Sequence, residues 1–499
     1  MEYPNITVLS PKGTNVRTAT PGDELAATAG VSPVPALVIP TATTPGEPRQ
    51  LNSLDMHLLD SETDCTPTHI GGIMILDSAN APDGPLDVGS LRRLFAERLH
   101  LLAPLRRRVR TVPLGLDVPY WEDCTTIDLG YHVRDVRLPE GATDKDVAEY
   151  VGRRHGETLD RSHPLWEFHL LSGLSGGRQA AYLKLHHALL DGVSAGEVLG
   201  SILDPIPGNP PQPLPATGLR RDKTLSILEM LTRTIPNTIN RQAVRVRSVV
   251  EAGPGLLRTV EDLWSKYRAE PFTGPLTPRR EVAFASLPLD QIKAVKSRVD
   301  GTINDVVMAV CTAALRLWLL DHGQSVEKSL LAAIPVSIRT NDQMGTAGNQ
   351  FSLMFSELPV GEPDPEHRLK LMHCAMLEAK ERFQSQSPTM LHQVTSMLTP
   401  LLHGLTTRGL LRATAPILPL TNLLISNVPG PTAPVYLGGV RLLGNYPVSA
   451  LAETFGGLNI TAVSYAGYVD FGILTCADII EDAWEIAHYL EVALAELAG

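Results

Sequence analysis

The chain of 499 residues is long enough for two or three ordinary domains, and its 43% hydrophobic and 19% charged residues describe a globular protein with sizeable cores. Its formal net charge of −11 argues against a nucleic-acid partner, because a phosphate backbone repels a negatively charged molecule. The five cysteines are widely spaced and form no CxxC pair, so neither a disulfide framework nor a structural zinc site is expected.

The N-terminal "MEYPNITVLSPKGTN" lacks the basic and apolar regions of a signal peptide. The most apolar stretch, residues 398–425, is interrupted by a histidine, two arginines and three prolines, which argues against a transmembrane helix. We therefore expect a soluble or membrane-surface protein of a reducing cytoplasm.

The N-terminal part of the chain changes character near residue 50. Residues 1–49 are rich in Thr, Pro, Ala and Gly without helical or strand periodicity, which predicts a disordered tail. Residues 50–204 are interpreted as a mixed α/β subdomain. Within it, residues 88–102 have helical spacing, residues 166–185 form a strand-turn-strand pattern, and a helix is expected from about 193 to 203.

Residues 205–281 are predicted to hold a proline-rich linker, "DPIPGNPPQPLPATG", and a basic helical segment. One interpretation of that segment is a solvated helix packed across two domains. Another is a surface that attracts anionic lipid or the phosphates of a nucleotide. Its clustered basic residues are Arg220, Arg221, Arg241, Arg245, Arg247, Arg279 and Arg280.

Residues 282–499 form a second mixed α/β region. The clearest helix is "TINDVVMAVCTAALRLWLLDHG", with Thr302 able to cap its start and Gly323 able to end it. Strands are expected in "LAAIPVSIR" and "LLISNVPGP", a hairpin in residues 458–475, and a closing amphipathic helix in residues 482–498.

The stretch "KLHHALLDGVSAG" concentrates the reactive side chains, and three mechanisms compete for it. His186, His187 and Asp191 are metal-ligand types, but adjacent histidines point to different sides and no other cluster has ligand spacing. Ser194 lies in a G-x-S-x-G match, but the whole "HHALLDG" segment separates it from the preceding strand, unlike a nucleophile elbow.

The third mechanism is general-base catalysis by a histidine. An imidazole can take the proton from a substrate hydroxyl near neutral pH, and the oxygen then attacks an acyl carbonyl without a covalent enzyme intermediate. Asp191 could turn inward to a cation and lock the loop, and Arg339 is a candidate for that cation. His186 also fits a packed, hydrogen-bonded core histidine.

The motifs as a set resemble those of bacterial wax ester synthase/diacylglycerol acyltransferases. "HHALLDG" resembles the family's HHxxxDG motif. The further matches follow in the family's order and extend over roughly residue 51 to the C-terminus: "PLW" from Pro164, "NDVVMA" from Asn304, "PVSIR" from Pro335 and "SNVPGP" from Ser426. Leu58 and Thr68 depart from the family pattern, where an aromatic residue and a methionine are usual, and both could line or support the acyl entry.

The resemblance implies an α/β (α+β mixed) fold of two chloramphenicol-acetyltransferase-like subdomains, each a mixed sheet with helices, that meet at a central cleft. It implies acyl-coenzyme A as co-substrate, no other cofactor and no metal. The acceptors would be diacylglycerol or long-chain alcohols. His187 would be the general base, with His186 supporting it and Asp191 locking the loop.

The remaining motif residues are candidates for substrate binding. Asn304 is placed to reach the cleft, whereas Asp305 also fits a helix capping box with Thr302. Arg339 follows a strand, and Ser426 and Asn427 open a stiff loop beside the cleft.

We expect peripheral association with the inner membrane face or with lipid droplets. The alternatives are a same-fold acyltransferase for another hydroxyl or an amine, and a non-catalytic lipid-binding relative.

Direct transfer predicts that Ser194→Ala keeps most of the activity and that a chelator has no effect, because neither a serine nucleophile nor a metal takes part. Labelled acyl-coenzyme A without acceptor should leave no label on the denatured protein. A stoichiometric burst of coenzyme A with covalent label on Ser194 or a cysteine would contradict direct transfer.

Overall fold

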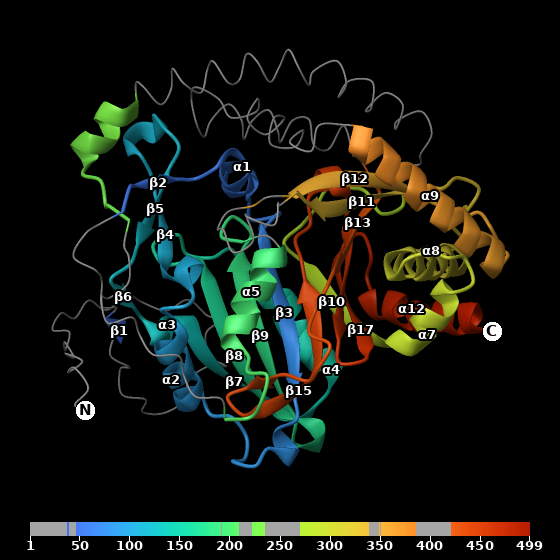
Figure 1. The fold of residues 1–499 in the computed structure, drawn as a ribbon, viewed down its shortest axis with the longest axis horizontal. Helices are drawn as coiled ribbons and strands as arrows, with labels where there is room; N and C mark the ends of the chain where they lie inside the picture. The colour runs from blue at the N-terminus through green and yellow to red at the C-terminus, as the bar shows by residue number, and fades with distance from the viewer. Residues whose placement is uncertain are drawn as a thin grey trace.

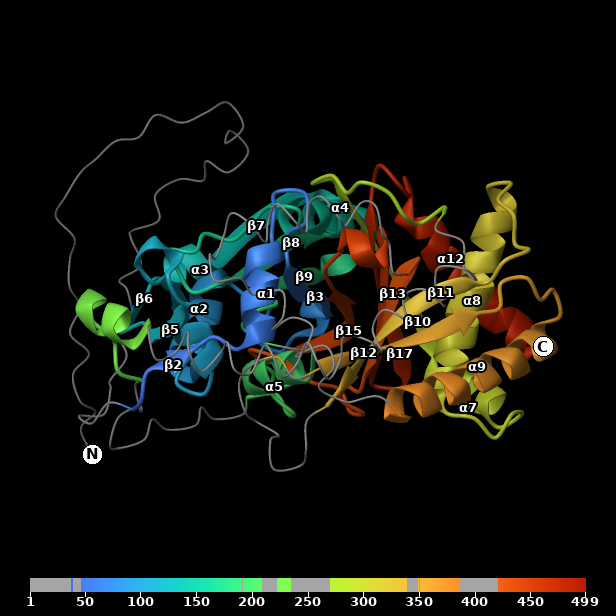
Figure 2. The same cartoon turned by 90° about the horizontal axis from the view of Figure 1, so that it is seen from above.

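The computed structural model consists of two halves, each built on a six-stranded sheet (Figures 1 and 2). It describes residues 37–38, 46–190, 192–208, 222–234, 270–338, 349, 351–385 and 421–499, with only the backbone at 38 and 192–194. The expected two mixed sheets are confirmed, and the halves lie next to each other along the long axis of the molecule (Figure 2).

The sheet of the N-terminal half has the strand order β14-β15-β3-β9-β8-β7. Its strands are β3 (His69–Leu76), β7 (Val133–Ala142), β8 (Trp166–Leu174), β9 (Gln179–His186), β14 (Tyr436–Leu437) and β15 (Val440–Val448). β8 and β9 pair antiparallel, which confirms the strand-turn-strand prediction. The helices of this half are α1 (Ser53–Ser61), α2 (Val88–Arg98), α3 (Leu129–His132), α4 (Asp144–His155) and α5 (Gly192–Ile202).

The sheet of the C-terminal half has the order β10-β17-β16-β13-β11-β12. Its strands are β10 (Arg280–Pro288), β11 (Leu330–Ser337), β12 (Phe351–Leu358), β13 (Leu423–Val428), β16 (Leu458–Tyr465) and β17 (Tyr468–Cys476). Its helices are α7 (Leu289–Lys296), α8 (Ile303–Asp321), α9 (Pro365–Ser385) and α12 (Ala483–Ala498). The described part of the chain also has short 3-10 helices, four in the N-terminal part of the sequence and one in the C-terminal part: η1 (Ser78–Asn80), η2 (Ala103–Arg106), η3 (Pro113–Gly115), η4 (Ser175–Gly177) and η7 (Glu453–Phe455).

Part of the segment expected to be a disordered tail is ordered. β1 (Leu37–Val38) pairs with β6 (Thr126–Ile127). β2 (Arg49–Gln50) joins β5 (Tyr120–Asp123) and β4 (Arg107–Arg110) in a small sheet. The prediction of disorder was therefore wrong at residues 37–38 and at Arg49. Backbone hydrogen bonds to a neighbouring strand order these short pieces, and such bonds need no apolar periodicity.

Helix α8 confirms the helix expected from Thr302 to Gly323, and its many buried apolar side chains place it in the C-terminal core. Thr302 and Asp305 make the expected capping box: the Thr302 hydroxyl accepts from the Asp305 N–H at 3.2 Å, and the Asp305 carboxylate accepts from the Thr302 N–H at 2.8 Å. Among the described helices, α8 alone is long and apolar enough to cross a membrane, but 72% of that stretch is buried inside the structure.

Trp166 packs the core of the N-terminal half. Its side chain is fully buried, its ring stacks on Phe95 at 5.3 Å between centroids, and its indole N–H donates to the carbonyl of Leu105 at 2.8 Å. Trp166 is the first residue of β8, so the "PLW" element leads into a strand and contributes to the core.

Strand β15 joins the two halves. It lies in the C-terminal part of the sequence, yet it pairs antiparallel with β3 in the N-terminal sheet. Gly472 of β17 lies against this strand so closely that an added Cβ would stand 1.6 Å from the carbonyl oxygen of Pro447. The absence of a side chain at Gly472 therefore allows the two sheets to approach each other.

Candidate active site

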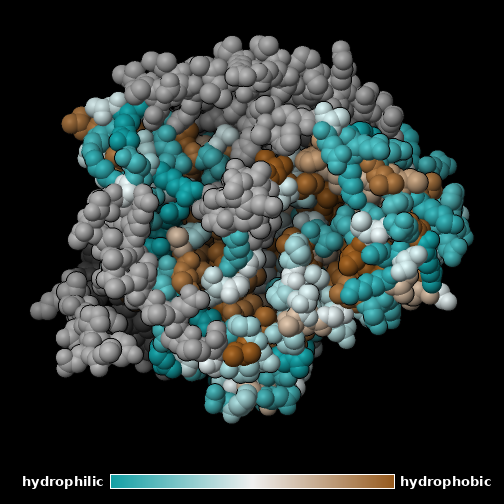
Figure 3. Space-filling view, viewed as in Figure 1, coloured by the Kyte–Doolittle hydropathy of each residue, from teal (hydrophilic) through white to brown (hydrophobic). Residues whose placement is uncertain are grey.

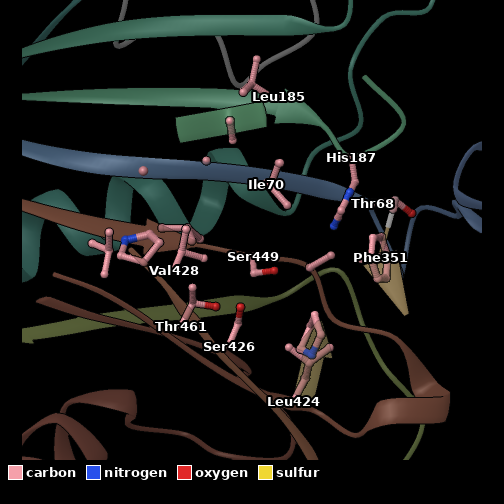
Figure 4. A pocket seen from close by; sticks show the side chains of 18 of the residues that line it. Thr68, Ile70, Leu185, His187, Phe351, Leu424, Ser426, Val428, Ser449 and Thr461 are labelled. Carbon is pink, nitrogen blue, oxygen red and sulfur yellow. The ribbon is translucent and has the colours of Figure 1, made fainter. Parts of the chain in front are cut away.

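A large cavity of about 1380 Å³ lies between the two sheets. Apolar side chains from both halves contribute to its walls, including Ile70, Leu185, Leu424 and Val428, and brown apolar surface is visible between the halves in Figure 3. His187 points into this cavity from the N-terminal half (Figure 4). A concave, mostly apolar site with few polar groups is the usual form of a binding pocket for a small or lipid molecule.

His186 and His187 face different surroundings although they are adjacent. His186 ends β9 and is fully buried. Its Nδ1 accepts a hydrogen bond from the Ala188 N–H at 3.0 Å, so the proton of the neutral ring is on Nε2, which lies 3.3 Å from Glu62 Oε1. The structure thus gives His186 a supporting position beneath the "HHA" turn.

Glu62 is a buried carboxylate that sequence analysis did not single out. Its Oε1 lies 3.3 Å from the Nε2 atoms of both His69 and His186, and its Oε2 accepts from Arg161 at 2.8 Å. Burial alone would raise the pKa of Glu62, but its polar contacts with His186 and His69 hold that pKa well below its ordinary value of 4.5. Glu62 therefore stays ionised and links β3, β9 and the segment after α1.

His187 is held from both halves of the molecule. Its backbone N–H donates to the carbonyl of Thr68 at 2.9 Å. Its ring Nδ1 lies 3.2 Å from Oδ1 of Asn349, and the ring stands 5.6 Å from that of Phe351. Thr68 belongs to the N-terminal half, whereas Asn349 and Phe351 come from the C-terminal half. The ring position of His187 thus requires the two halves to be assembled.

The two departures from the family pattern, Leu58 and Thr68, both line the cavity, as expected. Thr68 lies beside His187 in Figure 4. The side chain at each of these positions therefore shapes the space in which a substrate would lie.

Comparison with known proteins agrees with this architecture. The protein-family model described as the wax ester synthase/diacylglycerol acyltransferase catalytic domain matches residues 51–307. The family model of the WS/DGAT C-terminal domain matches residues 347–498. A putative diacylglycerol O-acyltransferase of Mycobacterium tuberculosis is 32% identical over 462 residues, covering 90% of each chain. The chain belongs to the wax ester synthase/diacylglycerol acyltransferase family.

Solved structures place this acyltransferase in the expected fold. The wax ester synthase/diacylglycerol acyltransferase from Marinobacter aquaeolei VT8 is 29% identical, with a TM-score of 0.66 over 90% of this chain and 98% of that one. A trichothecene 15-O-acetyltransferase from Fusarium sporotrichioides, at 14% identity and a TM-score of 0.58 over 94% and 99% of the two chains, shares the fold alone. The prediction of two chloramphenicol-acetyltransferase-like subdomains is thus confirmed.

Asn304 and Asp305 occupy different positions in the acyltransferase. Asp305 is buried in the α8 cap, where its carboxylate also lies 2.9 Å from His373 Nδ1, and it is not among the described cavity-lining residues. The structure thus favours the capping interpretation of Asp305 over substrate contact. Asn304 accepts a hydrogen bond from the side chain of Asn427 at 3.2 Å, and Asn427 lines the cavity. Asn304 therefore supports a cavity residue and is not itself among the described lining residues.

Ser426 and Asn427 line the cavity wall formed by the C-terminal half. Figure 4 shows Ser426 beside Thr461, across the cavity from His187. Asp191 and Arg339 lie outside the described residues, as does the side chain of Ser194. The expected pairing of Asp191 with Arg339 remains a prediction.

Replacing Glu62 by Gln is expected to lower the free energy of unfolding at pH 7–8 by about 1–3 kcal/mol, the range for a lost charged partner. The folded-state pKa lies below 4.5, so the contribution of the carboxylate is complete above that pH and declines as the pH falls. The difference between wild type and Glu62→Gln should therefore narrow below pH 4.5 in urea titrations.

The matched control is Glu157→Gln, whose side chain is 49% exposed and pairs with Arg154. This substitution should cost no more than about 1 kcal/mol. An equal loss for both variants, or a Glu62→Gln loss that grows on acidification, would contradict the assignment.

Proposed function

We propose that the protein is an acyl-coenzyme A-dependent O-acyltransferase that forms triacylglycerol or wax esters from diacylglycerol or long-chain alcohols. The observation that carries the proposal is the position of His187, which projects into a large apolar cavity between the two sheets. The names of the relatives support a lipid acceptor, and the apolar walls suit long hydrocarbon chains.

The proposed reaction is a direct transfer. The His187 imidazole takes the proton of the acceptor hydroxyl, and the oxygen forms a bond to the thioester carbonyl carbon. The carbon–sulfur bond then breaks, and the proton passes from the imidazolium to the sulfur. The products are the ester and the free thiol of coenzyme A, and His187 is neutral again. Acyl-coenzyme A is a co-substrate, and no step uses a metal or another cofactor.

The decisive experiment incubates the full chain with labelled palmitoyl-coenzyme A and hexadecanol, diacylglycerol, an amine or water, and then resolves the extracted lipids. Label should enter the ester of a lipid alcohol, and His187→Ala should lower turnover by roughly 10²–10⁴-fold while the protein stays folded. Transfer only to the amine or another hydroxyl would support the same-fold alternative. A wild type that transfers to none of them would support the non-catalytic alternative.

Ser426 and Asn427 are proposed to bind substrate, and Asn304 to hold Asn427 in place. Losing one hydrogen bond of about 0.5–1.5 kcal/mol predicts that Ser426→Ala and Asn427→Ala raise KM by roughly 2–10-fold. Asn304→Ala should have no further effect on KM once Asn427 is alanine. Steady-state kinetics measure these values, and an unchanged KM in all variants would remove the wall around Ser426 from substrate binding.

We propose that the acyltransferase is cytoplasmic and associates peripherally with the inner membrane face or with lipid droplets. The proposal is supported by the helix at residues 227–234, green at the upper left of Figure 1, where the side chains of Ile227 and Leu228 are 58% and 71% exposed. Exposed apolar side chains beside a basic segment are typical of a surface that binds lipid.

Liposome flotation tests membrane binding. Wild type should float with vesicles, more strongly with anionic ones at low salt, and Ile227→Ser with Leu228→Ser should weaken flotation. Leu377→Ser, at a 46% exposed position on α9, is the control and should float like wild type. Equal flotation of all variants would show that the helix at residues 227–234 does not contribute to membrane binding. Equal binding to neutral and anionic vesicles would show that electrostatic attraction does not contribute.

A further inference from the structure

Asn349 forms the one described side-chain link between His187 and the helix α1. Its own side chain is fully buried. Its amide Nδ2 donates to Asp55 Oδ1 at 2.7 Å and to the backbone carbonyl of His187 at 2.8 Å, and its backbone N–H also donates to Asp55 Oδ1 at 3.1 Å. A buried amide with this many partners has a single orientation.

The partners of Nδ2 decide which end of the amide faces the imidazole. A carboxylate oxygen and a backbone carbonyl are both acceptors, so only the NH₂ end of Asn349 can face them. The opposite orientation would place an amide oxygen 2.7 Å from the carboxylate of Asp55. Oδ1 of Asn349 must therefore face Nδ1 of His187, at 3.2 Å.

An amide oxygen accepts hydrogen bonds and donates none, so Nδ1 of His187 must carry the proton. In a neutral imidazole only one nitrogen is protonated, so the lone pair is on Nε2. Nε2 lies on the side of the ring away from Nδ1, and the ring lines the cavity. The hydrogen bond at Nδ1 thus leaves Nε2 with the lone pair that a general base needs.

We propose that Asn349, itself held by Asp55, fixes the tautomer and rotation of His187 so that Nε2 is the proton acceptor. Both are positioning residues, because they act through His187. The inference rests on the proposed function and adds to it how the base is prepared.

Asp55 is suited to this role because its own position is fixed. It lies in the first turn of α1 and is 2% exposed, and its backbone N–H donates to the capping side chain of Asn52 at 2.7 Å. Burial raises the pKa of Asp55 to about 6, although its hydrogen bonds with Asn349 oppose that rise. A carboxyl held this rigidly gives the amide of Asn349 a fixed acceptor.

The use of an amide has a chemical consequence. A carboxylate at Nδ1 would fix the same tautomer, but its charge would also stabilise the imidazolium and raise the pKa of the ring. The neutral oxygen of Asn349 fixes the tautomer with less of that effect. His187 can therefore release the proton to the departing sulfur after it has taken it from the hydroxyl.

The experiment compares Asn349→Ala, Asp55→Ala and Asp55→Asn with wild type. Asn349→Ala is expected to lower kcat roughly 10–10³-fold with KM changed by less than about threefold, because the base is misoriented while the cavity is kept. Asp55→Ala should lower kcat in the same way. Asp55→Asn should recover most of that loss, because its amide oxygen can still accept from Asn349.

Two further comparisons distinguish a loss of His187 positioning from a general loss of stability. In a His187→Ala background, Asn349→Ala should not reduce the residual activity further. Asn422→Ala removes another buried asparagine, one that holds the Leu331 N–H in the C-terminal sheet, and it serves as the control for a loss of stability without a loss of positioning. It should lower the melting temperature without the selective loss of kcat.

The tautomer itself is read by ¹⁵N NMR of histidine-labelled protein, with the His187 signals identified by their loss in His187→Ala. Above the pKa of the ring, wild type should show a protonated Nδ1 and an unprotonated Nε2, and folded Asn349→Ala should lose that pattern. A protonated Nε2 in wild type, or an unchanged pattern and kcat in Asn349→Ala, would overturn the proposal. A further loss of residual activity when Asn349→Ala is added to His187→Ala would also overturn the proposal.

The NMR arm needs no substrate, so the two proposals can fail separately. If wild type transfers acyl groups to no acceptor, the proposed function fails while the tautomer measurement still decides the role of Asn349. If transfer occurs but the tautomer does not depend on Asn349, only the positioning proposal fails. Asp55→Ala provides the same readout should Asn349→Ala not fold.

Discussion

The pairing of β15 with β3 is the constraint on which the rest of the structure depends. It inserts a strand from the C-terminal part of the sequence into the N-terminal sheet, with Val448 opposite Gly71 and Asn445 opposite Met74. Asp470 of β17 then accepts from the Asn445 N–H at 2.8 Å, so the C-terminal sheet is tied to the same strand. The cavity exists because two sheets are held at this fixed separation.

The position of the candidate base, His187, depends on the assembly of the two halves. His187 takes its backbone position from Thr68 and its ring position from Asn349, and these two residues come from opposite halves of the molecule. His186, one residue earlier, is fixed within the N-terminal half by Glu62 and by Ala188. The two neighbouring histidines thus have different surroundings: His186 is buried beneath the turn, and His187 lines the cavity.

The two histidines differ in the charge of the side chains that contact them. The carboxylate of Glu62 is ionised beneath the turn, where polar contacts with two histidines and Arg161 offset its burial. The imidazole of His187 instead lies 3.2 Å from the neutral side-chain amide of Asn349 and faces a cavity lined mostly by apolar side chains. The ionised carboxylate of Glu62 therefore contacts His186, whereas the candidate base His187 contacts a neutral amide, and the carboxyl of Asp55 lies behind that amide.

Much of the fold was predictable because the signals are local. The α8 helix follows from its apolar stripe and from the Thr302 cap, and the β8–β9 hairpin follows from its apolar runs and glycine turn. The HHxxxDG motif located the histidines. The ordered pieces at residues 37–38 and at Arg49 were missed, because their pairing partners lie more than 70 residues away and carry no local pattern.

The sequence by itself determined α8, the β8–β9 hairpin and the histidine pair, since each depends on a pattern within a few dozen residues, and the order of short motifs along the chain indicated the family. The tertiary structure decided which side chains surround that pair. The sequence pattern did not single out Glu62, Asn349 or Asp55, and Asn349 is 294 positions from Asp55 and 162 from His187. Their roles arise from the closure of two sheets around β15, because contacts at such separation have no periodic trace in the sequence.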